Sequence, residues 1–182
     1  MAVKTDNDVI QIFLPLITTA INATSFAPVI VAQSYQPTQQ GVESDPQVVF
    51  HKVGHKRYGF LKRFDQWNSV DMEMEHVESQ WIESQWQVAA LIRQNPATPN
   101  QFTASDLVNE VAAILQSDTI RIALMDEGIG ILRIENVSNP YFVDDFENFE
   151  ASPSFDFTLT YQNTRTSLNP VVSEFNNKII GV

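Results

Sequence analysis

Apolar residues recur along the chain at two spacings, one typical of helices and one typical of strands. An apolar run over residues 9–21 follows Asp6, which is suited to cap an amphipathic helix. A second helix is predicted to open at Thr103, because Asp106 stands three positions later and completes an approximate capping box. A third, shorter helix is predicted over residues 118–126. The buried stripes of the second and third helices comprise Leu107, Val108, Val111, Ile114 and Leu115, and Ile120, Ala123 and Leu124.

Alternating apolar and polar positions predict the strands. In the clearest case Phe155, Phe157, Leu159 and Tyr161 fall on one face, with Asp156, Thr158 and Thr160 on the other. In residues 70–93 the even positions carry Met72, Met74, Ile82, Trp86, Val88 and Ala90, and the core side is expected to change near Trp81. The segment after Gly54 reads as a continuation or a neighbour of the strand before it. The predicted strands are residues 29–31, 47–53, 56–64, 70–93, 129–137 and 154–164.

The stretch before the last strand is unusual because it is both acidic and aromatic. Residues 139–150 read as a loop, yet this loop carries four large rings that need a surface to pack on. Its rings are those of Tyr141, Phe142, Phe146 and Phe149, and its carboxylates are those of Asp144, Asp145, Glu147 and Glu150. We expect a contact loop anchored by a core strand.

Composition bounds the fold and excludes several classes of function. The 182 residues suffice for one domain with a sizeable core, so we expect an α+β domain over residues 1–170 and a partly mobile tail over residues 171–182. The net charge of -11 argues against a surface built to neutralise phosphates. No cysteine is present, which excludes disulfides, four-cysteine zinc sites and thiol nucleophiles. The apolar run at the N-terminus is too short for a bilayer, and Pro15 interrupts it, so no membrane partner is expected.

The candidate chemistry is sparse, and no catalytic, cofactor or metal site is predicted. His51 and His55 have a metal-pair spacing for a helix, but in a strand that spacing separates them by about 13 Å. The glycines of residues 126–131, DEGIGI, follow a helix instead of a strand, so Gly128 is better suited to end that helix than to bind a dinucleotide. No histidine accompanies a serine in a nucleophile motif.

Charge is segregated along the middle of the chain. Residues 51–63 hold Lys52, Lys56, Arg57, Lys62 and Arg63 and no acid, whereas residues 65–83 hold Asp65, Asp71, Glu73, Glu75, Glu78 and Glu83 and neither lysine nor arginine. One interpretation is a long hairpin, about residues 47–93, whose arms form cross-strand salt bridges. The other is a ribbon that sets its basic side against the acidic side of the next copy, a head-to-tail contact that closes into rings.

Three stretches carry a family resemblance: WIESQWQVAAL from Trp81, NPATPNQFTASDLVNEVAAILQS from Asn95, and GIGILRIENVSNPYFVDDFENFEASPSFDFTLTY from Gly128. Together they resemble the neck terminator, or gateway, proteins of tailed phages, which are related in fold to tail terminators. The likeness spans about residues 80–161. The first 70 residues match only in layout, an amphipathic helix followed by short strands.

The resemblance implies a structural virion protein with no enzymatic activity, made in the host cytoplasm and placed in the neck at the head-tail junction. Its implied fold is a twisted mixed or antiparallel sheet with helices on one face and an extended hairpin. Its implied assembly is a homo-oligomeric ring, typically a hexamer, between head-completion or connector proteins and the tail tube, with sheath proteins as further neighbours. Such a ring caps the tube and leaves a channel through which DNA passes without sequence-specific binding. Asp144, Asp145, Glu147 and Glu150 then line the channel or dock the neighbouring ring.

A second hypothesis remains open from the residues alone. It is a monomeric α+β domain that binds a ligand or a cation with the acidic aromatic loop 139–150. The EF-hand spacing and its turn glycine are missing from this loop.

Overall fold

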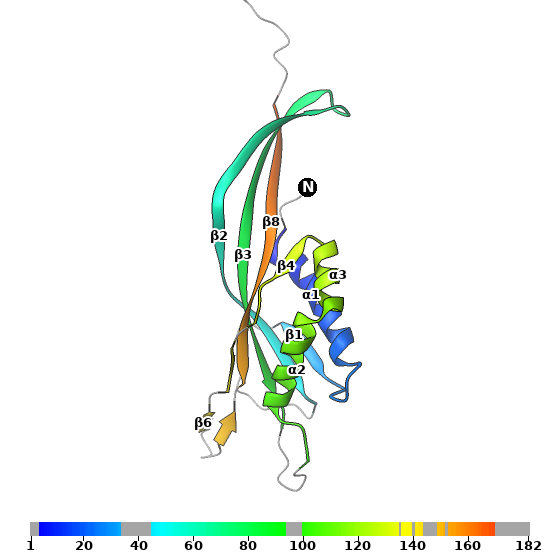
Figure 1. Ribbon diagram of the computed structural model, residues 1–182, viewed down its shortest axis with the longest axis vertical. Coiled ribbons are helices and arrows are strands. Elements are labelled where there is room, and N and C mark those ends of the chain that lie inside the picture. The colour runs from blue at the N-terminus through cyan, green and yellow to red at the C-terminus, as the bar shows by residue number, and fades with distance from the viewer. Residues whose placement is uncertain are drawn as a thin grey trace, which may run out of the picture.

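A computed structural model shows an α+β fold in which helices cover one face of a mixed, open sheet (Figure 1). The structure describes residues 4–33, 45–93, 100–134, 136–139, 141–143, 149–151 and 153–169. Within these residues the strand order is β1-β2-β3-β8-β4, and β5 also pairs with β8. Strands β1 and β2 are parallel, and the other pairs are antiparallel. The bounds are β1 Ile30–Gln33, β2 Gln47–Asn68, β3 Glu73–Leu91, β4 Ile129–Ile131, β5 Val137–Ser138 and β8 Ser154–Asn169. The predicted fold class is confirmed.

The first helix, α1 (Asp6–Ile21), begins one residue earlier than its sequence suggests. Thr5 is the N-cap, because its hydroxyl accepts a hydrogen bond from the Asp8 backbone N–H at 3.2 Å while the Asp8 carboxylate accepts one from the Thr5 N–H at 2.7 Å. The expectation that Asp6 caps the helix is therefore wrong by one position, and Asp6 is free to reach the sheet. The buried face of α1 comprises Val9, Ile10, Phe13, Ile17 and Ile21.

The two later helices follow the sequence prediction closely. The N-cap of α2 (Ala104–Gln116) is Thr103, and the predicted capping box with Asp106 is present. Helix α3 (Asp118–Asp126) is capped by Ser117, and the chain leaves it through Gly128 at a φ of 69°, a left-handed conformation that glycine adopts readily.

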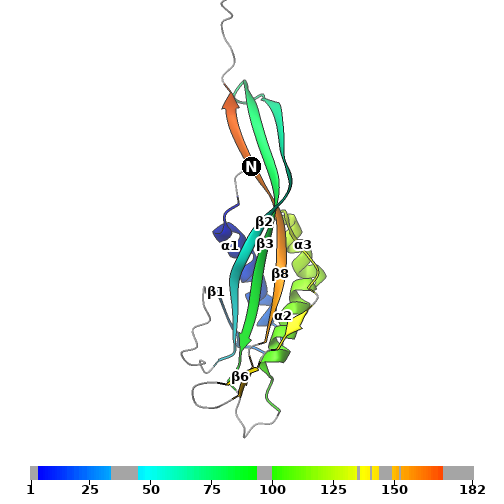
Figure 2. The same cartoon turned by 90° about the vertical axis from the view of Figure 1, so that its left-hand side faces the viewer.

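The core lies between the three helices and the lower half of the sheet (Figure 2). At its centre, the ring of Phe13 on α1 lies 5.5 Å from that of Phe50 on β2 and 5.2 Å from that of Trp86 on β3. Phe157 on β8 lies 6.1 Å from the same ring. These tilted and edge-on pairs are favoured by the ring quadrupoles, and they tie α1 to three adjacent strands.

The buried side of β3 changes along its length, as the sequence predicts near Trp81. In the C-terminal half of β3, the buried residues Ile82, Trp86 and Val88 stand at even positions. In its N-terminal half, the buried residues Val77 and Ser79 stand at odd positions. The register with β8 runs without a shift from Met74 to Ala89, so no bulge in this pairing turns the strand over.

Three strand predictions need correction. Residues 70–72 form the turn of the hairpin instead of a strand, with Met72 at a φ of 55°, and both Met72 and Met74 are exposed. The strand predicted over residues 129–137 is split into β4 and β5. From Ile131↔Leu159 to Val137↔Phe155 the chain advances six positions against four on β8, so the intervening segment holds two extra residues and leaves the ladder. Ile134 within this segment is buried in the core. Strand β8 in turn extends to Asn169, beyond the predicted end at residue 164.

The acidic aromatic segment contains a small antiparallel pair where a loop is expected. Strands β6 (Tyr141–Val143) and β7 (Phe149–Ala151) pair with each other, with Phe142 opposite Glu150. Residues 144–148, which hold Asp144, Asp145, Phe146 and Glu147, lie outside the described residues, as does the predicted tail.

Candidate assembly surface

Strands β2, β3 and β8 continue past the helices as a long, curved ribbon (Figures 1 and 2). We define the ribbon as residues 51–68, 73–82 and 162–169. Strands β2 and β3 form the predicted hairpin. Strand β8 adds a third strand, which pairs with β3 from Met74 to Ala89. Within the described residues, β1 reaches only as far as Phe50 on the outer edge of β2, and β4 reaches only as far as Tyr161 on the outer edge of β8. In the part of the chain that the structure describes, both edges of the ribbon therefore present unpaired backbone groups.

Strand β2 departs from regular pairing at two bulges. The first lies between Lys52 and Gly54. At the second, Tyr58 pairs with Trp81 and Lys62 pairs with Ser79, so three residues on β2 oppose one on β3. Gly59 permits this geometry with a φ of 71°. The side-chain amide of Gln80 donates to the Gly59 carbonyl at 3.1 Å and holds the bulge in place. We refer to residues 59–61 as the bulge.

The basic residues predicted for subunit contacts divide into two groups. Lys52 lies at the base of the ribbon and pairs with Asp6 of α1. Arg63 donates its Nε hydrogen to Glu78 at 3.0 Å across the hairpin. Lys56, Arg57 and Lys62 are exposed and form no ion pair with any other described residue, although the Lys62 ammonium lies 5.1 Å from the centre of the Phe64 ring. Cross-strand salt bridges consequently account for only part of the charge segregation.

The acidic residues of β3 show the same division. Glu78 is held by Arg63, and its carboxylate also lies 3.9 Å from Nε2 of His76. Glu75 accepts hydrogen bonds from the side-chain amides of Gln66 and Asn68, which lower the pKa of its carboxyl group. Glu73 and Glu83 have no cationic partner among the described residues. The structure thus leaves charges of both signs available on the ribbon, at Lys56, Arg57, Lys62 and Glu73, and at Glu83 next to it.

Large apolar side chains are concentrated on the same ribbon. Phe60 in the bulge is 100% exposed, and Tyr58 and Trp81 beside it are 62% and 50% exposed. Tyr58, Trp81, Ile82, Glu83 and Thr160 line a shallow depression of about 250 Å³, which we call the aromatic hollow. Further exposed apolar residues on the hairpin are Val53, Leu61, Phe64, Trp67, Val70, Met72 and Met74. Clusters of this kind mark contact surfaces in soluble proteins.

Sequence reasoning missed these aromatic residues, although one signal for them was present. A glycine inside a strand pattern indicates a bulge, and Gly59 interrupts the sequence between Tyr58 and Phe60. The bulge then exposes Phe60 instead of aligning it with a neighbour on β3.

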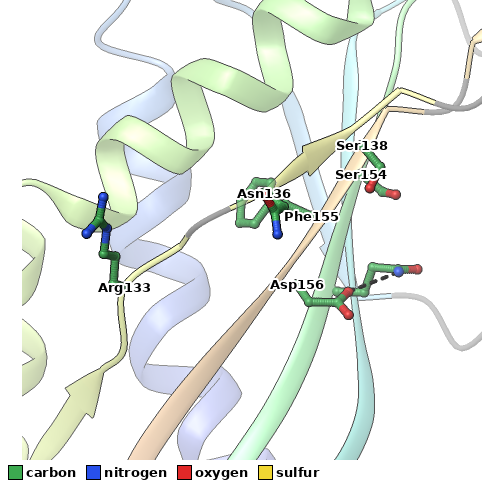
Figure 3. A pocket seen from close by; sticks show the side chains of 7 residues that line it. Arg133, Asn136, Ser138, Ser154, Phe155 and Asp156 are labelled. Carbon is green, nitrogen blue, oxygen red and sulfur yellow. Dashed lines mark hydrogen bonds between the residues drawn. The ribbon is translucent and has the colours of Figure 1, made fainter.

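A second concavity lies at the other end of the sheet, where β5 meets β8 (Figure 3). This cavity of about 330 Å³ is lined by Gln87, Arg133, Asn136, Ser138, Ser154, Phe155 and Asp156. The Asp156 carboxylate accepts a hydrogen bond from the Gln87 amide at 3.0 Å. Its two serines have no histidine beside them, because the three histidines lie on β2 and β3 within the ribbon. No histidine among the described lining residues is therefore in place to activate either serine.

Neither a metal cluster nor a membrane helix occurs in the part of the chain that the structure describes. There, no group of three or more histidine, aspartate and glutamate side chains is arranged to hold a metal ion. Likewise, none of the described helices is long and apolar enough to cross a bilayer.

In the described residues, an α+β body carries a long ribbon with unpaired charges and exposed rings, which is typical of proteins that make contacts with other chains. The family of the chain agrees with this class. The model of the E217 gateway protein gp29 family matches residues 8–171, and the chain belongs to this family. The predicted family is thus confirmed, over a longer stretch than the residues that carry the resemblance. Membership makes the chain a component of the tail or neck of a virion.

Structural comparison finds a similar arrangement in a contractile injection system. The sheath/tube terminator of the extracellular contractile injection system PVC, in its extended state, has a TM-score of 0.49 and 11% sequence identity to the chain. The similarity covers 100% of this chain and 66% of the terminator chain. Among curated proteins, no sequence matches significantly.

Proposed function

We propose that the chain forms a homo-oligomeric ring in the neck of a tailed phage, with six copies by analogy to its family. In this proposal the ring terminates the tail tube, joins it to the head-completion or connector proteins and leaves a channel for DNA. Sheath proteins are further neighbours. The observation that carries the proposal is the ribbon, whose Lys56, Arg57 and Lys62 have no ionic partner among the described residues and whose two edges are open.

The ribbon supports a ring because its charges and edges are asymmetric. Lys56, Arg57 and Lys62 lie on β2, at one edge, whereas Glu73 and Glu83 lie on the central strand β3. The separation is not complete, because Asp65 also lies on β2 and Arg165 lies on β8. A contact between the basic edge of one copy and the acidic face of the next joins different surfaces, so it is heterologous and closes when the rotation between copies divides a full turn. Lys52, Arg63, Glu75 and Glu78 contribute to this surface mainly by shaping it within the subunit, since each has a partner in its own chain.

The two ends of the molecule are suited to different neighbours. The hairpin turn lies at one end of the long axis, and the β6–β7 pair lies toward the other (Figure 1). We assign Tyr141, Phe142, Phe149 and Glu150 of that pair, with the intervening Asp144, Asp145, Phe146 and Glu147, to docking on an adjoining ring or to the channel wall. A net charge of -11 supports the passage of DNA, because like charges keep phosphates from adhering to the wall.

Charge reversal tests the proposed ring. The variant Lys56→Glu/Arg57→Glu/Lys62→Glu is expected to shift light scattering at micromolar concentration from the ring toward the monomer. The matched control, Arg93→Glu/Arg121→Glu/Arg133→Glu, makes the same change in net charge at exposed positions outside the ribbon and is expected to leave the ring intact. If both variants assemble like the unmodified chain, the charge segregation acts only within the subunit and the proposed contact is wrong.

A further inference from the structure

One molecule carries both a fully exposed ring in the bulge and an open aromatic hollow. Phe60 is fully exposed on the outer edge of β2, whereas the hollow lies on the sheet face that the helices leave uncovered and extends to Thr160 on β8. We propose that Phe60 of one copy inserts into the aromatic hollow of a second copy of this chain. This inference rests on the proposed ring and names the residues that close it.

The bulge and the aromatic hollow lie at neighbouring positions along the strands, as a contact between adjacent copies requires. The bulge lies opposite Gln80, whose amide binds the Gly59 carbonyl. In the hollow, Trp81 pairs with Gln162 and Glu83 pairs with Thr160. Gln80 and Trp81 are adjacent on β3, so the bulge lies level with the Trp81 end of the hollow, and Thr160 lies about 10 Å further along the strands. We place the ribbon along the ring axis, and in that arrangement a contact between copies joins surfaces at similar levels of the strands.

Charge complementarity supports a second copy as the occupant, although Lys56 of the same subunit also stands opposite Glu83 in the β2–β3 register. Arg57 and Lys62 flank the bulge, and neither has an anionic partner among the described residues. Glu83 lines the hollow and has no cationic partner there. When Phe60 enters the hollow of a neighbour, the two cations approach that carboxylate, and the ring of Phe60 meets the half-exposed rings of Tyr58 and Trp81. An aromatic anchor bordered by opposite charges is a common centre of interface affinity.

A single subunit does not make this contact with itself. Strands β2 and β8 are separated by β3, and two strand spacings amount to about 10 Å between the backbones of Phe60 and Thr160. Disulfides require Cα atoms less than about 7 Å apart. A disulfide between positions 60 and 160 therefore reports a contact between copies, and the absence of native cysteine leaves no competing thiol.

The test combines this crosslink with a thermodynamic variant, both in the full chain. Under mild oxidation, Phe60→Cys/Thr160→Cys is expected to give a ladder of covalent oligomers that ends at the size of the ring. The control Val70→Cys/Thr160→Cys places one thiol at the exposed hairpin turn, far above the hollow, and is expected to remain monomeric on a denaturing gel. Phe60→Ala is expected to weaken assembly at least about tenfold in apparent dissociation constant, without changing the circular dichroism spectrum.

The outcomes separate this inference from the proposed function. A ring of normal mass in light scattering, without the 60–160 ladder and with unchanged affinity in Phe60→Ala, overturns the inference and leaves the ring standing. Equal crosslinking in the control shows random collision and also overturns it. A chain that stays monomeric at every concentration and forms no ladder contradicts both the docking and the ring.

Discussion

Tyr58 and Trp81 lie opposite each other across the β2–β3 ladder, and their side chains are 62% and 50% exposed. Both residues stand on the face of the sheet that the helices leave uncovered. A pair of large rings in such a position gains little from the subunit's own core, so its value lies in contacts with another surface. The protein thus divides into a body stabilised by Phe13, Trp86 and their neighbours and a ribbon available for assembly.

The division between body and ribbon predicts a large loss of stability when Phe13 is replaced by alanine and almost none when Phe60 is replaced. Phe13→Ala removes a ring that contacts three buried aromatic residues and is expected to lower the free energy of unfolding by about 3–5 kcal/mol. Phe60→Ala removes a fully exposed ring and is expected to change the free energy of unfolding by less than about 0.5 kcal/mol. Urea denaturation at a concentration where the chain is monomeric measures both. Equal losses would show that the bulge packs within the subunit.

The N-cap of α2 predicts a moderate loss of folding stability when Thr103 is replaced by alanine. Thr103→Ala removes the hydroxyl that accepts from the Asp106 N–H at 3.1 Å and is expected to cost about 1 kcal/mol. Thr119→Ala, at an exposed position inside α3, is the matched control and is expected to be nearly neutral. Thermal unfolding of the two variants side by side distinguishes a cap from a general preference for alanine. A cap that contributes nothing would leave their melting temperatures equal.

The two capping boxes also predict how stability depends on pH. Hydrogen bonds from Thr5 lower the pKa of Asp8, with its side chain as the main donor, and the backbone N–H of Thr103 is the main cause of the lowered pKa of Asp106, in both cases from an ordinary value of 3.8. Below that value the unfolded chain binds more protons than the folded chain, so stability rises with pH across this window. The contribution is complete above about pH 4 and is lost as the pH falls through the folded values.

Denaturation at pH 5 and pH 3 measures this effect. Asp8→Asn/Asp106→Asn is expected to show a smaller loss between the two pH values than the unmodified chain, because the two titrations are removed. An identical loss in both proteins would show that other carboxyl groups set the acid sensitivity.

Replacing Gly59 in the bulge is expected to lower stability through backbone strain, because no neighbouring atom would clash with an added Cβ. A Cβ at Gly59 or at Gly54 would meet no atom within 4 Å, but only Gly59 has a positive φ, at 71°. Gly59→Ala is therefore expected to lower the free energy of unfolding by about 1–2 kcal/mol, and Gly54→Ala is expected to lower it much less. Chemical denaturation of the two variants checks the difference. If Gly59→Ala is as stable as Gly54→Ala, the bulge adopts another conformation in solution.

The sequence predicted the elements whose signals are local. Thr103 and Asp106 mark a helix start by their spacing alone, and alternation from Phe155 to Tyr161 marks the core part of β8. The last residues of β8 were missed because they lie on the exposed ribbon, where no buried face imposes alternation. The break between β4 and β5 depends on the register with β8, which a single segment does not reveal.

The assembly surface was predictable in part. The two stretches of segregated charge form the β2–β3 hairpin, and their role in subunit contacts stays a prediction. Charge segregation could not show which cations find partners within the subunit. The pairs Lys52–Asp6 and Arg63–Glu78 follow from the arrangement of α1 and the register of the hairpin. The exposure of Phe60 likewise depends on a bulge whose position is set by the pairing of Tyr58 and Lys62.

The mass of the particle in solution tests the central claim most directly. Sedimentation of the full chain at micromolar concentration, in low and in moderate salt, is expected to show one closed species at six times the 20.6 kDa mass of the chain, with partial dissociation in moderate salt because exposed charges are screened. The absence of intermediate masses would mark closure. A monomer at every concentration in both salts would contradict the account, as would an open series of masses without an end point.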